Sequence, residues 1–108
     1  MKIKIATVAR IVCREFDVTK EQLEGKNRMR KFSIARHAFY YLCYKHGHSL
    51  KKIGMWLGDR DHTTVMHGKR IAETAIGIDR LNKIESEIIM YNNNFYRLEG
   101  EDNDARQS

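Results

Sequence analysis

Residues 58–67, Gly-Asp-Arg-Asp-His-Thr-Thr-Val-Met-His, carry the side chains best suited to specific polar recognition. Asp61 follows a glycine-bearing turn and is a suitable N-cap, because its carboxylate can accept from the free N–H groups of the next helical turn. His62, Thr63 and Thr64 then fall in that first turn. Threonine offers a hydroxyl and a methyl group, and histidine a ring N–H or lone pair, so these side chains can read base edges. The pattern is typical of the second helix of a helix-turn-helix motif.

The order of these residues resembles the C-terminal DNA-binding domain of the DnaA family of bacterial replication initiators, in which Gly-Gly-Arg-Asp-His-Thr-Thr-Val is characteristic. The resemblance extends to residues 49–54 (Ser-Leu-Lys-Lys-Ile-Gly), which match the first helix of the pair, and to residues 35–43 (Ala-Arg-His-Ala-Phe-Tyr-Tyr-Leu-Cys), which match a helix led by an Arg-Gln pair. It covers about residues 5–76. It implies an all-α fold and sequence-specific binding of double-stranded DNA, with the second helix of the motif in the major groove.

A basic segment at residues 26–31 precedes the matched helix. The resemblance implies that Arg28 enters the minor groove, where a narrow A·T-rich groove has the most negative potential. It implies that Arg36 and His37, at the Arg-Gln pair, contact the DNA backbone. Histidine in place of glutamine keeps a donor and makes that contact sensitive to protonation.

The predicted interface combines these residues with nearby polar side chains. Arg60, beside the N-cap, could reach a phosphate, and Asp61 could accept from a cytosine amine. Lys51 and Lys69 are either phosphate contacts or ordinary solvated lysines. We predict the following DNA-contacting residues: Arg28, Arg30, Arg36, His37, Lys51, Arg60, Asp61, His62, Thr63, Thr64 and Lys69.

Some residues depart from the family pattern. Lys51 stands where proline is usual, and Asp59 replaces the second glycine of the turn, which places a negative charge near phosphates. The chain has no ATPase module, so ATP-driven assembly is not implied. This favours a stand-alone protein acting in replication or transcription control, of the kind that phages and mobile elements encode.

Composition agrees with a polyanion partner. The chain has 108 residues, enough for one domain, with a formal net charge of +6 and a pI near 9.5. Cys13 and Cys43 lie in apolar helical patterns and are expected to be reduced core thiols. No signal peptide or membrane-spanning run is visible, which indicates the bacterial cytoplasm and its nucleoid. No metal-ligand spacing or catalytic set is present, so no metal, cofactor, small-molecule substrate or enzymatic activity is predicted.

Periodicity predicts an all-α helical bundle. The absence of proline and the positions of the glycines support this. Helices are expected at about residues 3–16, 20–25, 33–46, 50–57 and 61–77, with a capping box at residues 19–22 and an N-cap at Ser49. Residues 1–78 then form the helix-turn-helix domain.

The segment after residue 78 has a different pattern. Its apolar positions step by three and four, which is typical of a seam that faces one other helix. We predict an additional helix at residues 79–98 and a disordered polar tail at residues 99–108. The seam could form a homodimer or bind a replication protein, an alternative function as a protein-interaction module, or it could fold back as the last piece of the monomer core. The seam residues are Leu81, Ile84, Ile88, Tyr91, Phe95 and Leu98.

Overall fold

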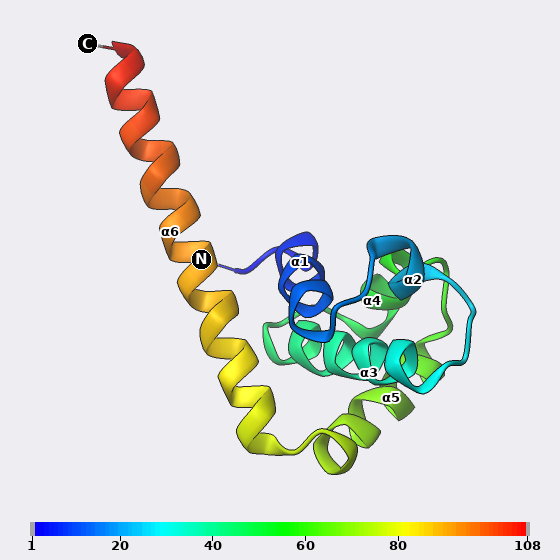
Figure 1. The fold of residues 1–108 in the computed structure, drawn as a ribbon. Coiled ribbons are helices and arrows are strands. Elements are labelled where there is room, and N and C mark those ends of the chain that lie inside the picture. Colours follow the sequence, from blue (N-terminus) through cyan, green and yellow to red (C-terminus); the bar gives the residue numbers. More distant parts are fainter. Residues whose placement is uncertain (1, 108) are drawn as a thin grey trace.

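The computed structural model of the protein describes the backbone of residues 2–107 and the side chains of residues 2–94. Over this part of the chain it contains six helices and no strand: α1 (Ile5–Phe16), α2 (Lys20–Glu24), α3 (Arg30–Lys45), α4 (Leu50–Trp56), α5 (His62–Ala75) and α6 (Ile78–Gln107). Figure 1 shows α6 along one side of the bundle and α2 with α4 on the other. The predicted all-α fold is confirmed. Among the described residues, none of these helices has the length and apolar character needed to cross a membrane.

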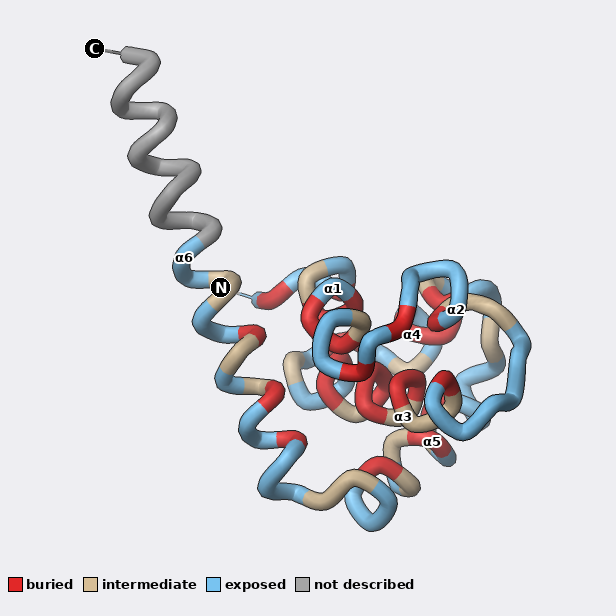
Figure 2. The backbone as a smooth tube through the Cα atoms, in the orientation of Figure 1, coloured by how far each residue is buried: buried red, intermediate tan, exposed pale blue. Residues whose placement is uncertain are grey.

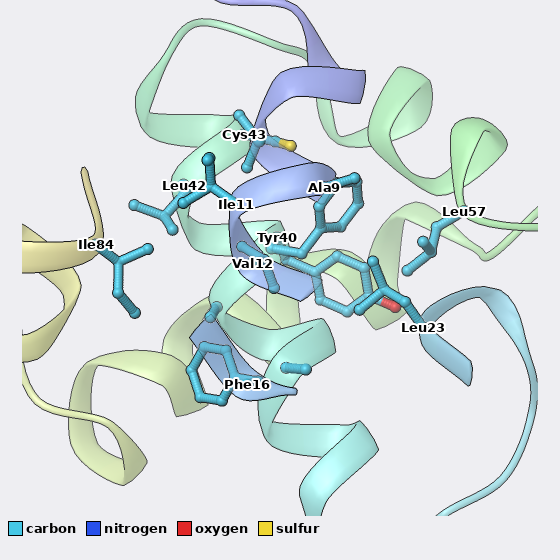
Figure 3. Close-up of a cluster of buried hydrophobic side chains, with 14 of the residues drawn as sticks. Ala9, Ile11, Val12, Phe16, Leu23, Tyr40, Leu42, Cys43, Leu57 and Ile84 are labelled. Atoms are coloured by element: carbon cyan, nitrogen blue, oxygen red, sulfur yellow. The ribbon is translucent and has the colours of Figure 1, made fainter. Parts of the chain in front are cut away.

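The core is built around α3. Ala35, Ala38, Phe39, Leu42 and Cys43 are fully buried in it. Figure 3 shows side chains from α1, α2, α6 and the segment after α4 meeting those of α3. Burying a large apolar side chain such as that of Phe39 contributes about 1.5–3 kcal/mol, so this cluster is what holds the helices in fixed positions.

Two helix starts illustrate how well capping chemistry predicts boundaries. The capping box at Thr19 and Gln22 forms as predicted, with each side chain accepting from the other residue's backbone N–H. In contrast, α3 begins at Arg30, three residues before the predicted start at Ser33. The carbonyl of Met29 accepts from the backbone N–H groups of Phe32 and Ser33, each at 3.0 Å, so Ser33 lies inside the first turn instead of capping it.

The turn between α4 and α5 is tight. Ser49 caps α4 by accepting from the backbone N–H of Lys52 at 3.1 Å. Gly58 adopts a φ of +80°, and Asp59 follows with a φ of 59°. The N–H of Arg60 then donates to the carbonyl of Gly54 at 2.8 Å. A Cβ at Gly54 would lie 2.0 Å from the carbonyl oxygen of Arg60, so no side chain fits where the turn crosses α4.

A second glycine brings α5 against α3. A Cβ at Gly68 would lie 2.6 Å from Cδ2 of Tyr40 and 2.9 Å from Cδ2 of His37. Val65 and Ala72 are fully buried on the same helix. Direct packing therefore fixes α5 against the centre of the bundle.

Of the alternatives predicted for the C-terminal seam, the structure supports packing in the monomer core. Leu81 and Ile88 are fully buried and Ile84 is 2% exposed, all within the monomer core. Figure 2 shows the buried positions of α6 on the side facing the bundle. Glu85 reinforces this packing, with an ion pair to Lys45 at 2.9 Å and a contact to His46 at 3.0 Å. The first part of the seam covers apolar surface of α1 and α3, so it is not free to form a dimer.

The rest of the seam and the tail are described less completely. Tyr91 is half-buried and packs against the core, while the side chains of Phe95 and Leu98 lie outside the described part. The backbone continues as α6 to Gln107, where a disordered tail was predicted from residue 99. Gly100 does not end the helix, since an interior glycine costs only about 1 kcal/mol. Ser108 lies outside the described residues.

Candidate nucleic-acid interface

The start of α5 presents its polar side chains to solvent. Asp61 is the N-cap, as predicted, and its Oδ1 accepts from the backbone N–H of Thr63 at 3.4 Å. The same oxygen lies 3.0 Å from Nδ1 of His62. His62, Thr63 and Thr64 are exposed, while Val65 is fully buried. The first turn of α5 is thus anchored by Val65 and free to contact a ligand through the three residues before it.

A hollow of about 480 Å³ separates this turn from the basic loop, which we define as residues 25–29. Its walls come from the loop, from α3, from the turn between α4 and α5, and from α5. The hollow brings together five predicted site residues: Arg28, Arg36, His37, Arg60 and Thr64. The same hollow is also lined by Lys26, Ser33, Tyr40, Gly58, Asp59, His67 and Gly68.

A second hollow, of about 410 Å³, lies between α4 and the start of α5. Lys51 and Met55 line it from α4, and Asp61 and His62 line it from the cap and first turn of α5. Lys51 is exposed there. The structure therefore places a positive charge from the first helix of the motif next to the polar start of the second.

The basic loop is ordered by short-range hydrogen bonds. The side-chain Oδ1 of Asn27 accepts from the backbone N–H of Met29 at 2.9 Å. The hydroxyl of Ser33 donates to the carbonyl of Arg28 at 3.4 Å. These bonds fix the backbone on both sides of Arg28, whose side chain is exposed.

Arg36, for which a DNA-backbone contact was predicted, is bound to backbone carbonyls of the protein itself. Its residue is only 7% exposed, and its guanidinium donates to the carbonyls of Leu23 at 2.8 Å, Gln22 at 2.8 Å and Asn27 at 2.6 Å. Burial lowers the pKa of Arg36, and the positive charge of Arg60 adds to this effect. Because each of its three guanidinium nitrogens donates to one of these carbonyls, Arg36 is turned toward the protein.

Arg60 is likewise bound within the protein, where a phosphate contact was predicted. Its Nη1 donates to the carbonyl of Glu24 at 2.9 Å and also to that of Leu57, and its Nη2 donates to that of Gly25. The side chain crosses from the turn to the end of α2. It lines both hollows but is held by backbone carbonyls.

Three other predicted residues have distinct surroundings. His37 is half-buried between α3 and α5; burial lowers its pKa, followed by the charges of His67 and Arg36. The Nζ of Lys69, on α5, lies 4.7 Å from the centre of the Tyr44 ring, on α3, which is a cation–π contact. Arg30 is exposed at the start of α3 and lines neither hollow.

The structure adds His67 to the candidate interface. It is exposed and lines the larger hollow beside Thr64. Positions three apart on a helix share a face, so the spacing between Thr64 and His67 carried this signal in the sequence. Lys26 also lines the hollow, as a basic loop residue that the predicted set did not include.

Comparison with known proteins identifies related sequences. The sequence model of the family described as "Bacterial dnaA protein helix-turn-helix" matches residues 5–71. The "Chromosomal replication initiator protein DnaA" of Brucella abortus biovar 1 (strain 9-941) is 36% identical over 89 residues, which are 82% of this chain and 18% of that protein. The protein of the same name from Corynebacterium jeikeium (strain K411) is 44% identical over 64 residues, 58% of this chain and 11% of the relative.

A longer match comes from Chloroflexus aurantiacus (strain ATCC 29366 / DSM 635 / J-10-fl). Its "Chromosomal replication initiator protein DnaA" is 35% identical over 101 residues, 92% of this chain and 20% of that protein. The chain thus spans 20% or less of the length of these relatives.

Proposed function

The chain belongs to the bacterial DnaA helix-turn-helix family, and from this premise we propose that it binds double-stranded DNA in a sequence-specific manner. The relatives are named as chromosomal replication initiators, so we propose that its sites lie in DNA that controls replication or transcription. The nucleotide-dependent activities of a full initiator are outside this proposal, because the chain spans only a small part of such a protein.

One observation carries the proposal: the exposed start of α5 and the basic loop border a single hollow. An α-helix start of this kind fits the major groove, and an exposed arginine on a loop fits the adjacent minor groove. A phosphate backbone lies between the two grooves of a duplex. The hollow between α5 and the loop is the place for that backbone in the proposed complex.

Each side chain then has a role that follows from its exposure. His62, Thr63 and Thr64 read base edges from the first turn of α5. Arg28 enters the minor groove from the loop, and Lys51 contacts a phosphate beside α5.

The remaining candidates divide by their surroundings. Lys26 and His67 line the hollow and face the same phosphate backbone. Arg30 and Lys69 are at most peripheral phosphate contacts, since neither lines a hollow. We leave Arg36 and Arg60 out of the contact set, because their donors are bound to protein carbonyls.

Selection of bound sites from random duplexes, followed by titration of the selected site and a scrambled duplex, tests this function. We expect recovery of one motif, with an A·T-rich step at one end. Affinity should fall with salt along a log–log slope of about −0.9 for each phosphate contacted. A protein that recovers no motif, or binds both duplexes equally, would refute sequence-specific recognition.

A dimer-forming module is not favoured as a second function. The residues that would form its seam at Leu81, Ile84 and Ile88 are buried in the monomer. We therefore propose that one protein molecule binds one asymmetric site, and sedimentation equilibrium of the complex measures this stoichiometry directly.

A further inference from the structure

The carbonyls at the end of α2 and in the basic loop are bound by two guanidinium groups. Arg36, from α3, takes three of these carbonyls, and Arg60, from the turn before α5, takes two. We call Arg36 and Arg60 the arginine pair. The carbonyls bound by it belong to Gln22, Leu23, Glu24, Gly25 and Asn27.

The chemistry of this arrangement requires arginine. The last carbonyls of a helix have no intrahelical donor, and a cation near them is also favoured by the helix dipole. A planar guanidinium offers five N–H donors in a fixed geometry and can serve several carbonyls at once, which an ammonium on a flexible chain does not reproduce. The carbonyls also offset the cost of burying Arg36 beside the like charge of Arg60.

The arginine pair links the end of α2 and the basic loop to α3 and to the turn before α5. The backbone of Arg60 is fixed on α4, because its N–H donates to Gly54 at 2.8 Å. Its side chain reaches Glu24 and Gly25, where the basic loop begins. Arg36 holds the carbonyl of Asn27, the residue directly before Arg28.

We propose that Arg36 and Arg60 are positioning residues that hold the loop bearing Arg28 in register with the start of α5, so that both grooves are read at one fixed spacing. This inference rests on the proposed function. It differs from the DNA-backbone contact that the family resemblance implies for Arg36 and from the phosphate contact predicted for Arg60 beside the N-cap.

Charge-preserving substitutions separate the two roles. A residue that contacts a phosphate needs mainly its charge, so lysine should retain most of the binding and the salt dependence. A residue that holds several carbonyls needs the guanidinium, so lysine should release the loop although the charge remains. Arg36→Lys and Arg60→Lys are the test variants. Arg30→Lys is the matched control, since Arg30 is exposed and has none of these carbonyl bonds among the described contacts.

The first measurement uses the free protein. The amide hydrogen of Met29, which is bonded to Asn27 in the loop, should exchange about tenfold faster in both test variants, equivalent to ~1.4 kcal/mol of easier local opening. Core amides of α3 and α5 report whether the protein stays folded. If the Arg36→Lys variant is unfolded, the Arg60→Lys variant alone tests the proposal, because Arg60 is only half-buried. Unchanged exchange at Met29 in a folded Arg60→Lys variant would overturn the proposal.

The second measurement uses DNA. Both variants should lose about tenfold of the preference for the A·T end of the selected site, the factor expected for one misread base pair, and keep the discrimination made by α5. Combining either change with Arg28→Ala should add no further loss at that end. Two results together would instead assign phosphate contacts to Arg36 and Arg60. The lysine variants would keep the full A·T preference, and the salt slope would become smaller by about 0.9 only in the variants with alanine in place of arginine. Absence of any preferred site in the unmodified protein would refute the proposed function, and the exchange of Met29 would still decide whether the arginine pair orders the loop.

Discussion

The two regions that face DNA in the proposed complex are held in place by different forces. The start of α5 is positioned by packing: Val65 and Ala72 are fully buried, and Gly68 lies against α3. Residues 26–29 of the basic loop, in contrast, are all exposed, and hydrogen bonds from a few side chains fix their backbone. Packing distributes the stabilisation over many contacts, whereas the loop depends on a small number of polar groups.

This difference implies unequal sensitivity to substitution. Changes that alter the position of α5 should lower the stability of the whole domain, because the same residues form its core. Changes that alter the loop should affect only the reading of one end of the site. The predictions below test that division, in order of decreasing effect.

Gly54→Ala should have the largest effect on stability, because it changes the packed region that positions α5. A Cβ there would meet the Arg60 carbonyl oxygen at 2.0 Å, so the turn must move away from α4. We expect a loss of about 3 kcal/mol in the free energy of unfolding, the upper part of the range for overpacked sites, measured by urea denaturation.

Gly77→Ala is the control for this change. Gly77 has a φ of +92°, and a Cβ there would meet nothing within 4 Å. Its substitution adds backbone strain of about 1–2 kcal/mol without a clash. Equal losses for the two variants would show that the close approach at Gly54 contributes little.

Thr63→Ala and His62→Ala should leave stability nearly unchanged, because both side chains are exposed. Each should reduce discrimination between the selected site and random DNA by about 1–3 kcal/mol. Competition binding measures this directly, with the exposed Thr74 at the other end of α5 as the Thr74→Ala control. If Thr63→Ala retained full discrimination, the start of α5 would not be the reading element.

The packed region was predictable from sequence because its signals are local. A polar N-cap at Asp61, a glycine turn at Gly58 and an apolar stripe from Val65 each act within one or two helical turns. The structure confirms the predicted cap and shows a positive φ at Gly58. The close contact at Gly54 is not visible in this way, since it joins the backbones of residues six positions apart only once the turn is folded.

The loop and α6 were harder to predict because their partners are distant in sequence. Arg36 carries the same charge whether it faces a phosphate or a buried carbonyl, and the three carbonyls that it contacts lie 9 to 14 positions away. The narrow apolar stripe of α6 suits a second copy as well as it suits α1 and α3. The burial of Ile88 shows that this stripe packs in the monomer core.

Arg28→Ala should change one end of the site and nothing else. The side chain is exposed, so stability should be unaffected. We expect a loss of about 1 kcal/mol of preference for A·T pairs at that end, the lower part of the range for one base pair. Binding to duplexes that differ only in those pairs measures it, and Arg28→Lys shows how much is due to charge alone. A uniform loss over both ends of the site would mean that the loop does not read DNA independently of α5.

The smallest expected effect concerns His37, which lies between α3 and α5 on the hollow that separates the two regions. Burial, followed by the charges of His67 and Arg36, holds its pKa below the usual value of about 6.5. Above that pH the side chain is neutral in both the folded and the unfolded chain, and it has no effect on their balance. Below it the unfolded chain takes up the proton first, so the free energy of unfolding should fall as the pH decreases from about 6.5 toward the pKa of the folded state.

DNA should act on His37 in the opposite direction. A phosphate in the hollow would favour the protonated ring, so the complex should take up a proton that the free protein does not hold. Urea denaturation of the free protein at pH 7.5 and 5.5, compared with His37→Gln, isolates the first effect, and DNA affinity over the same interval isolates the second. We expect His37→Gln to lose less stability on acidification and to gain less affinity. His37 touches α5 at Gly68 and faces the loop across the hollow. If acidification lowers stability but raises DNA affinity through His37, the DNA backbone lies between the two regions. If acidification changes both in the same direction, there is no phosphate at that position.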